Sequence, residues 1–132
     1  MDNNRVFEKT IFEKIISGEV PSYKVYEDEL TCAFLDAFPT VRGHVLVVPK
    51  RAVDKIYDLS SEDWDAVWAT VKKMSVHMEK VLGQRIFYQV MGTEVSHAHV
   101  HLIPQSPDYE QGKTLELTAE EMREIADKIR LS

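Results

Sequence analysis

Three of the five histidines in this chain alternate with apolar residues in one short segment near its C-terminal end. His97, His99 and His101 occupy every second position of the sequence HAHVHLIP, and the residues between them are apolar. Successive side chains of a β-strand point to opposite faces, so a period of two is typical of a strand. The spacing therefore predicts a strand that carries three imidazoles on one face and anchors its apolar residues on the other.

Three interpretations of this histidine row are open on the residues alone. The histidines could be satisfied polar groups on a half-exposed sheet, although three in register have a high desolvation cost. Two of them could bind a metal ion together with His44. All three could not share one ion, because His97 and His101 would lie about 13 Å apart on a straight strand. The third interpretation is nucleophilic catalysis by a neutral central imidazole. The alternation favours it, because each flank then supplies a proton carrier.

Four segments, in order, resemble the histidine-triad superfamily of nucleotide hydrolases and transferases. The row from His97 to Ile103 is similar to its His-x-His-x-His-x-x signature, in which x is apolar. Residues 11–21 are similar to its N-terminal helix, residues 34–39 to the end of its ribose-binding strand, and residues 43–51 to its central strand. A four-part match in order is specific, and it spans about residues 11–105.

The resemblance implies a role for each histidine. His99 matches the family's nucleophile, which attacks the α-phosphorus to give a nucleotidyl-histidine that water then hydrolyses. His101 is expected to bond a phosphate oxygen or the bridging atom and to help the leaving group depart. His97 is expected to orient the strand and His99. By the same resemblance, His44 is expected near the α-phosphate, in the network around His97.

The resemblance also implies a nucleotide-binding surface. Asp36 is expected to accept hydrogen bonds from both ribose hydroxyls; on the residues alone, it could equally be a turn residue. The side chains expected to sandwich the base are Phe12, Ile15, Val20 and Phe34. The backbone N–H groups expected to face the phosphate belong to Gly92, Thr93, Glu94, Val95 and Ser96, with Gln89 as the candidate amide.

The segment before the histidine row departs from the family pattern. Members commonly have Gly-Gln followed by Ser or Thr, whereas this chain has Gly92, Thr93 and Glu94. A carboxylate beside a phosphate is repulsive unless it is paired, protonated or turned aside. We therefore expect a basic or amine leaving group rather than a polyphosphate. The expected substrate is a nucleoside phosphoramidate or an aminoacyl-adenylate. The alternatives are a dinucleoside polyphosphate hydrolase and a nucleotide-binding regulator with incidental hydrolysis.

No cofactor is expected. Some relatives bind a structural zinc through a Cys-x-x-Cys pair and a histidine, and this chain has Thr10, Glu13 and Ala52 at those places. Cys32 is the only cysteine and lies in an apolar alternation, so we expect it in the core rather than at a redox or metal site.

Composition limits the partners further. The net charge of −6 disfavours the broad basic face that polynucleotide binding requires. No apolar run approaches the roughly 20 residues of a membrane span. The first five residues lack the basic start and the apolar stretch of a secretory signal, so a cytoplasmic location is expected. The expected partner is a small purine nucleotide, and neither a polynucleotide nor a membrane is expected as a partner.

The periodicities predict an α+β fold with a mainly antiparallel five-stranded sheet. The predicted strands are residues 24–27, 31–36, 43–48, 85–91 and 98–103. A long helix from Ser60 to Gly83 is expected to cover the sheet, with Trp64 and Trp68 in the core and Thr70 on its polar face.

Shorter helices are expected at both ends of the chain, at residues 11–17 and at about residues 118–131. The length fits one domain over residues 1–132. The C-terminal helix lies outside the segments that carry the resemblance. The resemblance implies a homodimer whose two sheets join into one.

Overall fold

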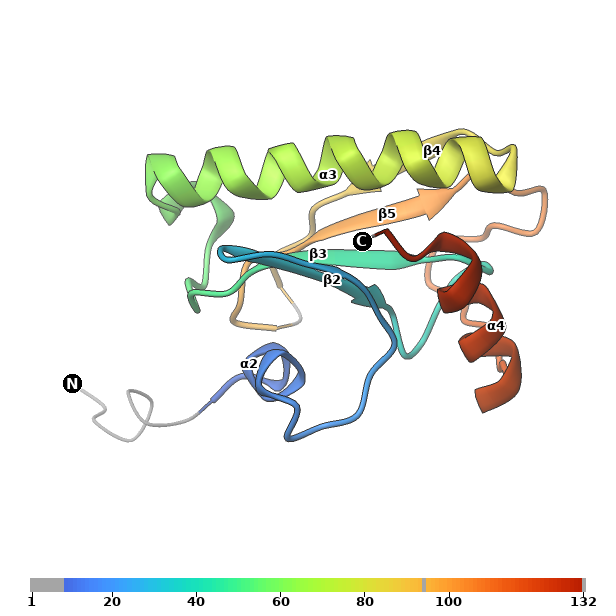
Figure 1. The fold of residues 1–132 in the computed structure, drawn as a ribbon, viewed down its shortest axis with the longest axis horizontal. Coiled ribbons are helices and arrows are strands. Elements are labelled where there is room, and N and C mark those ends of the chain that lie inside the picture. The colour runs from blue at the N-terminus through green and yellow to red at the C-terminus, as the bar shows by residue number, and fades with distance from the viewer. Residues whose placement is uncertain (1–8, 94, 132) are drawn as a thin grey trace.

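The computed structural model of this protein describes residues 9–93 and 95–131. Within these ranges, five strands form one antiparallel sheet in the order β1-β2-β3-β5-β4 (Figure 1). The strands are β1 (Lys24–Glu27), β2 (Thr31–Leu35), β3 (Val45–Pro49), β4 (Ile86–Gln89) and β5 (Val100–Pro104). The helices are α2 (Ile11–Ser17), α3 (Ser61–Leu82) and α4 (Ala119–Ile129), with a short 3-10 helix, η1 (Ile56–Asp58). The predicted α+β class and antiparallel sheet are confirmed.

Local side-chain signals set the ends of the helices. Thr10 and Thr118 are the N-caps of α2 and α4, and each forms a capping box with the glutamate three residues later. α3 begins after Ser60, whose hydroxyl accepts a hydrogen bond from the N–H of Asp63, and it ends at Gly83 in the left-handed conformation. These signals lie within a few residues of the ends they define. The first helix and the long helix consequently lie where the sequence predicts them.

The two faces of the sheet have different coverings (Figure 1). α3 and α4 pack on one face and bury the larger core, which includes Val25, Leu35, Val47, Leu102, Val71, Met74, Met78, Met122, Ala126 and Ile129. On the other face, Phe12 of α2 packs against Cys32, Phe34 and Leu46, and Cys32 is fully buried as predicted. Because α2 has only seven residues, it covers part of this face and leaves space beside it.

Two predictions for α3 are wrong. Trp64 was expected in the core but is 42% exposed. Its ring contacts Trp68, which in turn contacts Tyr88 of the edge strand β4. In the described part of the chain, no further strand covers that edge. Thr70 was expected on the polar face but is buried, and its hydroxyl lies 2.7 Å from that of Thr31. A buried hydroxyl with such a partner has a much smaller desolvation cost.

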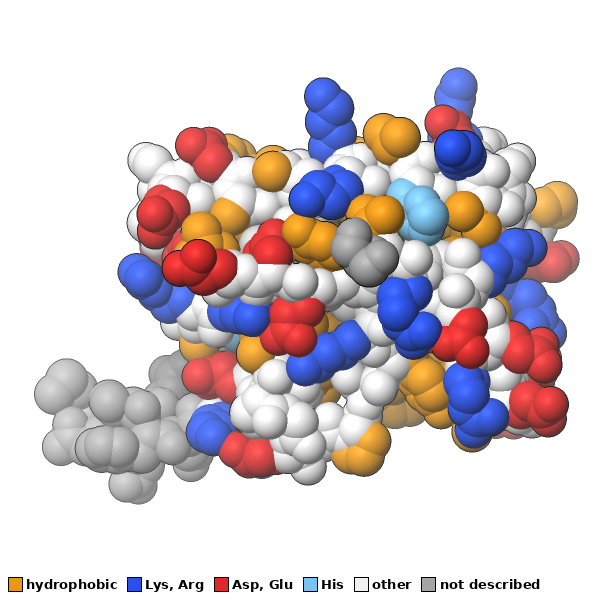
Figure 2. Space-filling view, viewed as in Figure 1, with side chains coloured by type: hydrophobic (Ala, Val, Ile, Leu, Met, Phe, Trp, Pro, Cys, Tyr) orange, Lys and Arg blue, Asp and Glu red, His pale blue; other side chains and the backbone are white. Residues whose placement is uncertain are grey.

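The surface carries both signs of charge. Figure 2 shows lysine and arginine side chains interspersed with aspartate and glutamate on the face seen in Figure 1. Across the described ranges, no helix combines the length and the apolar character that a membrane crossing needs.

Candidate active site

The histidine row lies on the sheet face that carries α2. His101 is in β5, whereas His97 and His99 precede the strand, which begins only at Val100. The rings of His99 and His101 have centroids 5.0 Å apart, and Phe12 of α2 contacts both His97 and His99. All three histidines are buried. The predicted strand is therefore too long, but the imidazoles do gather on one side.

Pro49 explains why β5 starts late. The register of β3 with β5 pairs Val47 with Val100, so Pro49 would lie opposite Ala98 if the ladder continued. Proline has no backbone N–H to donate, and the N–H of Ala98 instead donates to the carbonyl of Val53 at 2.7 Å. The carbonyl of Pro49 is thus available to a side chain.

His97 uses that carbonyl and is held at both ring nitrogens. Its Nε2 lies 2.8 Å from the oxygen of Pro49, and because a carbonyl can only accept, Nε2 carries the proton. Its Nδ1, 2.8 Å from Oγ1 of Thr10, therefore accepts from that hydroxyl. The ring is fully buried, and the resulting desolvation lowers its pKa. His97 is a neutral, fixed ring that connects β3 to the start of α2.

His99 is oriented through the backbone of His97. Its Nδ1 lies 2.7 Å from the carbonyl oxygen of His97, so Nδ1 carries the proton and donates it to that carbonyl. In the neutral ring, Nε2 then keeps a free lone pair. The side chain is 3% exposed and lines a cavity between α2, β2 and α4. Such an imidazole can act as a nucleophile at Nε2.

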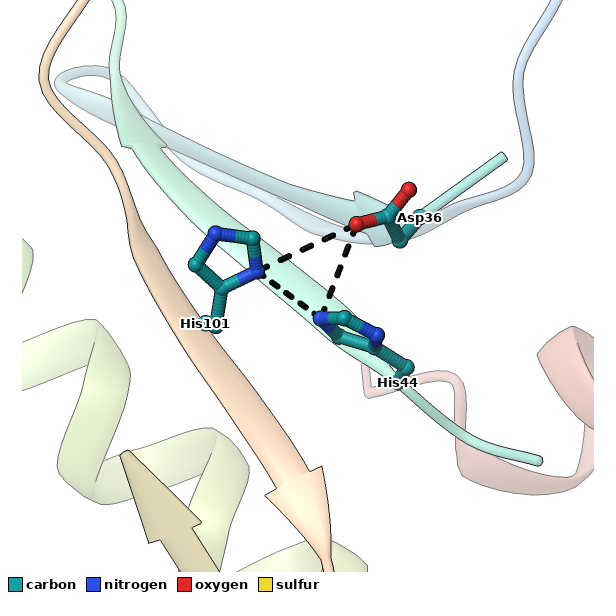
Figure 3. A group of neighbouring side chains, drawn as sticks. All are labelled: Asp36, His44 and His101. Atoms are coloured by element: carbon teal, nitrogen blue, oxygen red, sulfur yellow. Dashed lines mark hydrogen bonds and ion pairs between the residues drawn. The ribbon is translucent and has the colours of Figure 1, made fainter. Parts of the chain in front are cut away.

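His44 and His101 form a hydrogen-bonded pair (Figure 3). The backbone N–H of Thr40 donates to Nδ1 of His44 at 3.1 Å, so the proton of a neutral His44 is on Nε2. This Nε2–H donates to Nδ1 of His101 at 2.8 Å. The proton of His101 is therefore on its own Nε2, which is buried and has no hydrogen-bond partner among the described residues. Burial lowers the pKa of both histidines to about 4.

Asp36 follows β2 and faces this pair (Figure 3). Its Oδ2 lies 3.5 Å from Nε2 of His44 and 3.9 Å from Nδ1 of His101, while its Oδ1 accepts from the N–H of Phe38 at 2.8 Å. Desolvation raises the pKa of this carboxyl group. A carboxylate at these distances stabilises an additional proton on the histidine pair.

Among the described residues, Asp36, His44 and His101 could together hold a metal ion, since one ligand atom from each lies within 4.8 Å of the others. Two nitrogens bound to one tetrahedral zinc at about 2.0–2.1 Å would be separated by about 3.3 Å. The two ring nitrogens are 2.8 Å apart, which is a hydrogen-bond distance. Metal binding would therefore replace the shared proton and push the rings apart.

A cavity of about 520 Å³ lies beside His99 and His101. It brings together the residues that the sequence analysis assigned to the nucleoside, namely Phe12, Ile15, Val20, Phe34 and Asp36. Leu117, Ala119 and Met122, at the start of α4, form another part of its wall. The sequence shows α4 as an amphipathic helix but carries no local signal of where it docks, so these residues were missed.

Residues 92–96, which were expected to face the phosphate, contribute little to the wall of the large cavity. Val95 lines the large cavity, whereas Gly92, Thr93 and Ser96 are exposed and are not part of its wall. Glu94 lies outside the described residues. Gly92 does have the left-handed conformation, with φ of 71°.

A second cavity, of about 290 Å³, adjoins the histidine pair and includes Gln89. It shares Asp36, Phe38 and His101 with the large cavity. Thr40 and Tyr109, which no sequence pattern indicates, also line it.

Comparison with known proteins identifies the family of this chain. The sequence matches the HIT domain family over residues 17–108. The chain belongs to the HIT domain family. An uncharacterized HIT-like protein of Borreliella burgdorferi is 34% identical, over 92% of this chain and 96% of that protein. The adenosine 5'-monophosphoramidase hnt1 of Schizosaccharomyces pombe is 32% identical, over 90% of this chain and 94% of that protein.

Solved structures of HIT proteins share the fold. A HIT-like protein of Bartonella henselae, described as involved in cell-cycle regulation, superposes with a TM-score of 0.82 at 32% identity, covering 92% of this chain and 94% of that one. A HIT family member from Bacillus subtilis superposes with a TM-score of 0.74 at 30% identity, covering 95% and 99%. The resemblance inferred from the histidine row is confirmed at the level of family and fold.

Proposed function

We propose that this HIT protein is a nucleotide hydrolase that acts at the α-phosphate of a purine nucleotide through a nucleotidyl-His99 intermediate. The observation that carries the proposal is the hydrogen bond from Nδ1 of His99 to the carbonyl of His97, 2.7 Å long. It fixes the tautomer in which Nε2 has a free lone pair, in a side chain that lines a cavity of nucleotide size.

The nucleoside would occupy the large cavity. The rings of Phe12 and Phe34 are already in contact, with centroids 5.7 Å apart, so a base would lie between this aromatic pair and aliphatic side chains such as Ile15 and Val20. Asp36 lines the same cavity and has carboxylate oxygens that can accept from ribose hydroxyls. His99 would then lie on the phosphate side of the nucleoside.

The reaction would proceed in two displacements. For a phosphoramidate, Nε2 of His99 attacks the α-phosphorus, and the bond from phosphorus to the leaving nitrogen breaks with its electron pair on nitrogen. The leaving nitrogen takes a proton from the His44–His101 pair. Water then attacks the phosphorus, the bond to Nε2 breaks, and the pair recovers a proton from the water. The pair is neutral in the free protein, because its pKa values are about 4. A bound phosphate anion and Asp36 would favour its protonation.

The leaving group in this proposal is the amine of a nucleoside phosphoramidate or the amino acid of an aminoacyl-adenylate, which departs as its carboxylate. The S. pombe relative is named an adenosine 5'-monophosphoramidase, and a Saccharomyces cerevisiae relative, 36% identical over 72% of this chain and 61% of that protein, has the same activity in its name. A dinucleoside polyphosphate hydrolase is the second candidate, because both reactions need the same nucleophile and nucleoside cavity.

The test is hydrolysis of adenosine 5'-phosphoramidate, followed by chromatography of AMP, with the intermediate trapped by acid quench and mass spectrometry. We expect adenylate on His99, and a loss of at least about a thousandfold in kcat for His99→Gly. His77→Asn is the matched control, since His77 lies on α3 and is half-buried outside both cavities. Unchanged turnover in His99→Gly would refute the nucleophile. Tight AMP binding without any turnover would instead indicate a regulator.

We also infer that the protein is a homodimer whose sheets join at β4. Within residues 9–93 and 95–131, this strand is at the edge of the sheet and one side of its backbone has no partner strand. Large hydrophobic side chains are exposed on and after it and on the adjacent helix α3, namely Tyr88, Val90, Met91, Trp64 and Val76. Light scattering coupled to size-exclusion chromatography should give twice the chain mass of 15.2 kDa. A monomer at micromolar concentration would refute this inference.

A further inference from the structure

The large cavity continues from the histidine side of the sheet onto the opposite face. Phe12 and Phe34 belong to the small core under α2, and Phe12 contacts His99 there. Other lining residues belong to the core between the sheet, α3 and α4 or pack against it, namely Tyr23, Leu35, Leu117 and Met122. The cavity therefore passes around the end of β2, where Asp36 and Ala37 follow the strand, and reaches α4.

The part of the cavity on this opposite face is the α4 compartment. It is lined by Ser22, Tyr23, Leu35, Leu117, Ala119 and Met122. Apart from two hydroxyl groups, these side chains are apolar, and none of the six carries a charge. An ionic group placed here would lose its hydration without gaining a charged partner. An apolar group, in contrast, would exchange water for aliphatic and aromatic contacts.

The α4 compartment adjoins the proposed place of the base. Val20, which is expected beside the base, is followed in the chain by residues 21–23, which also line the cavity. Phe34, which is expected on another side of the base, is followed by Leu35 of the α4 compartment. Both segments that would enclose the base thus continue into this compartment. A group attached to the base would consequently extend into it.

The wall that α4 contributes is held in place at both ends of the helix. Glu121, in the first turn, forms an ion pair with Arg42, which lies just before β3. Beyond the last turn, the N–H of Leu131 donates to the carbonyl of Val25 in β1 at 2.8 Å. A preformed wall needs little ordering when a ligand binds. The HIT domain match ends at residue 108, so α4 lies outside it.

We propose that the α4 compartment is a subsite for an apolar substituent on the base, so that this protein prefers nucleotides whose purine carries an alkyl or aryl group. The inference rests on the proposed function, which places a nucleoside in the large cavity, and it adds a class of substrate. Burial of a group the size of a phenyl ring against Leu117 and Met122 removes its surface from water. Such burial favours binding by about tenfold or more.

The experiment measures the Kd of three nucleotides by isothermal titration calorimetry. These are AMP, AMP with a benzyl group on N6, and AMP with a benzylamino group at C2. At least one derivative should bind about tenfold or more tightly than AMP. Ala119→Asp introduces a carboxylate at the α4 compartment and should reduce this gain by about fivefold or more. Ala69→Asp is the matched control, because Ala69 is exposed on α3 and does not line this cavity, and it should leave the gain unchanged.

The outcomes separate this subsite from the hydrolase function. If AMP binds but neither derivative binds more tightly, the subsite is overturned while the nucleotide site stands. Equal losses of the gain in Ala119→Asp and Ala69→Asp also overturn the subsite. If Ala119→Asp alone removes the gain but adenosine 5'-phosphoramidate is not hydrolysed, the hydrolase function fails and the subsite stands. If none of the three nucleotides binds, both fail.

The substitution at Ala119 is compatible with the fold. Ala119 is exposed and is the first residue of α4, where an acidic side chain interacts favourably with the helix dipole. A loss of affinity in Ala119→Asp would therefore report on the α4 compartment rather than on unfolding.

Discussion

Thr10 has two functions that a substitution can separate. Its hydroxyl accepts a hydrogen bond from the N–H of Glu13 as the N-cap of α2, and it donates to Nδ1 of the buried His97. Thr118 caps α4 with the same capping box, and in the part of the chain that the structure describes its hydroxyl makes no bond to a histidine. Comparing the two threonines therefore isolates the bond to His97.

The expected losses follow from this difference. Thr118→Val removes a cap and should lower the free energy of unfolding by about 1 kcal/mol. Thr10→Val removes a cap and also leaves Nδ1 of His97 buried without a donor, which adds about 1–3 kcal/mol. The total for Thr10→Val is then about 2–4 kcal/mol. Thr10→Ser keeps the hydroxyl and should stay within about 0.5 kcal/mol of the wild type.

Urea unfolding followed by circular dichroism measures these changes. Thr10→Val should also reduce kcat for the phosphoramidate, because the carbonyl of His97 holds the nucleophile His99, and Thr10→Ser should restore it. Equal destabilisation by Thr10→Val and Thr118→Val would show that the bond to His97 contributes nothing. Full activity in a folded Thr10→Val protein would show that it does not position His99.

Two further predictions concern Gly43 and His44, which immediately precede β3. Gly43 and Gly18 both have left-handed backbones, with φ of 88° and 87°, but only a Cβ at Gly43 would meet neighbours, Pro104 at 3.1 Å and Leu82 at 3.3 Å. Gly18→Ala should lower the free energy of unfolding, measured in urea, by about 1 kcal/mol, and Gly43→Ala should lower it by about 2 kcal/mol or more. Equal losses would show that the contacts around Gly43 have no effect. The pKa of His44 is lowered in the folded state, from 6.5 to about 4. Between these pH values the unfolded chain therefore binds more protons than the folded one. The free energy of unfolding consequently falls as the pH drops from 6.5 to 4. The loss in the free energy of unfolding attributable to His44 is about 3 kcal/mol. Unfolding curves measured at several pH values should therefore show a weaker dependence of this free energy on pH for His44→Asn than for the wild type. An unchanged dependence would show that His44 is not desolvated.

The sequence predicts those parts of the fold that local signals determine. Helix ends depend on a capping side chain or a glycine within the first or last turn, and the predicted long helix ends at Gly83 as observed. Strand ends depend on the partner strand. β5 was predicted from Ala98 but begins at Val100, because Pro49, far away in the sequence, cannot donate to it.

The residues of the candidate site likewise fall into those that local sequence signals indicate and those that only long-range packing determines. The histidines and the apolar residues of α2 and β2 could be found, because their spacing is regular and their family pattern is contiguous. Tyr109 and Met122 could not be found from the sequence, because they line the two cavities from segments whose docking depends on long-range packing. The link between Thr10 and His97 was hidden for the same reason, since 87 residues separate them.

The protonation pattern of the site is set largely by the backbone. The carbonyl of Pro49 fixes the tautomer of His97, the carbonyl of His97 fixes that of His99, and the N–H of Thr40 fixes that of His44. Burial alone would favour neutral rings but would leave the position of each proton undetermined. A carbonyl cannot donate and an amide N–H cannot accept, so each of these contacts permits one tautomer only. The free lone pair of His99 is in this way a consequence of how β3 and the segment before β5 fold.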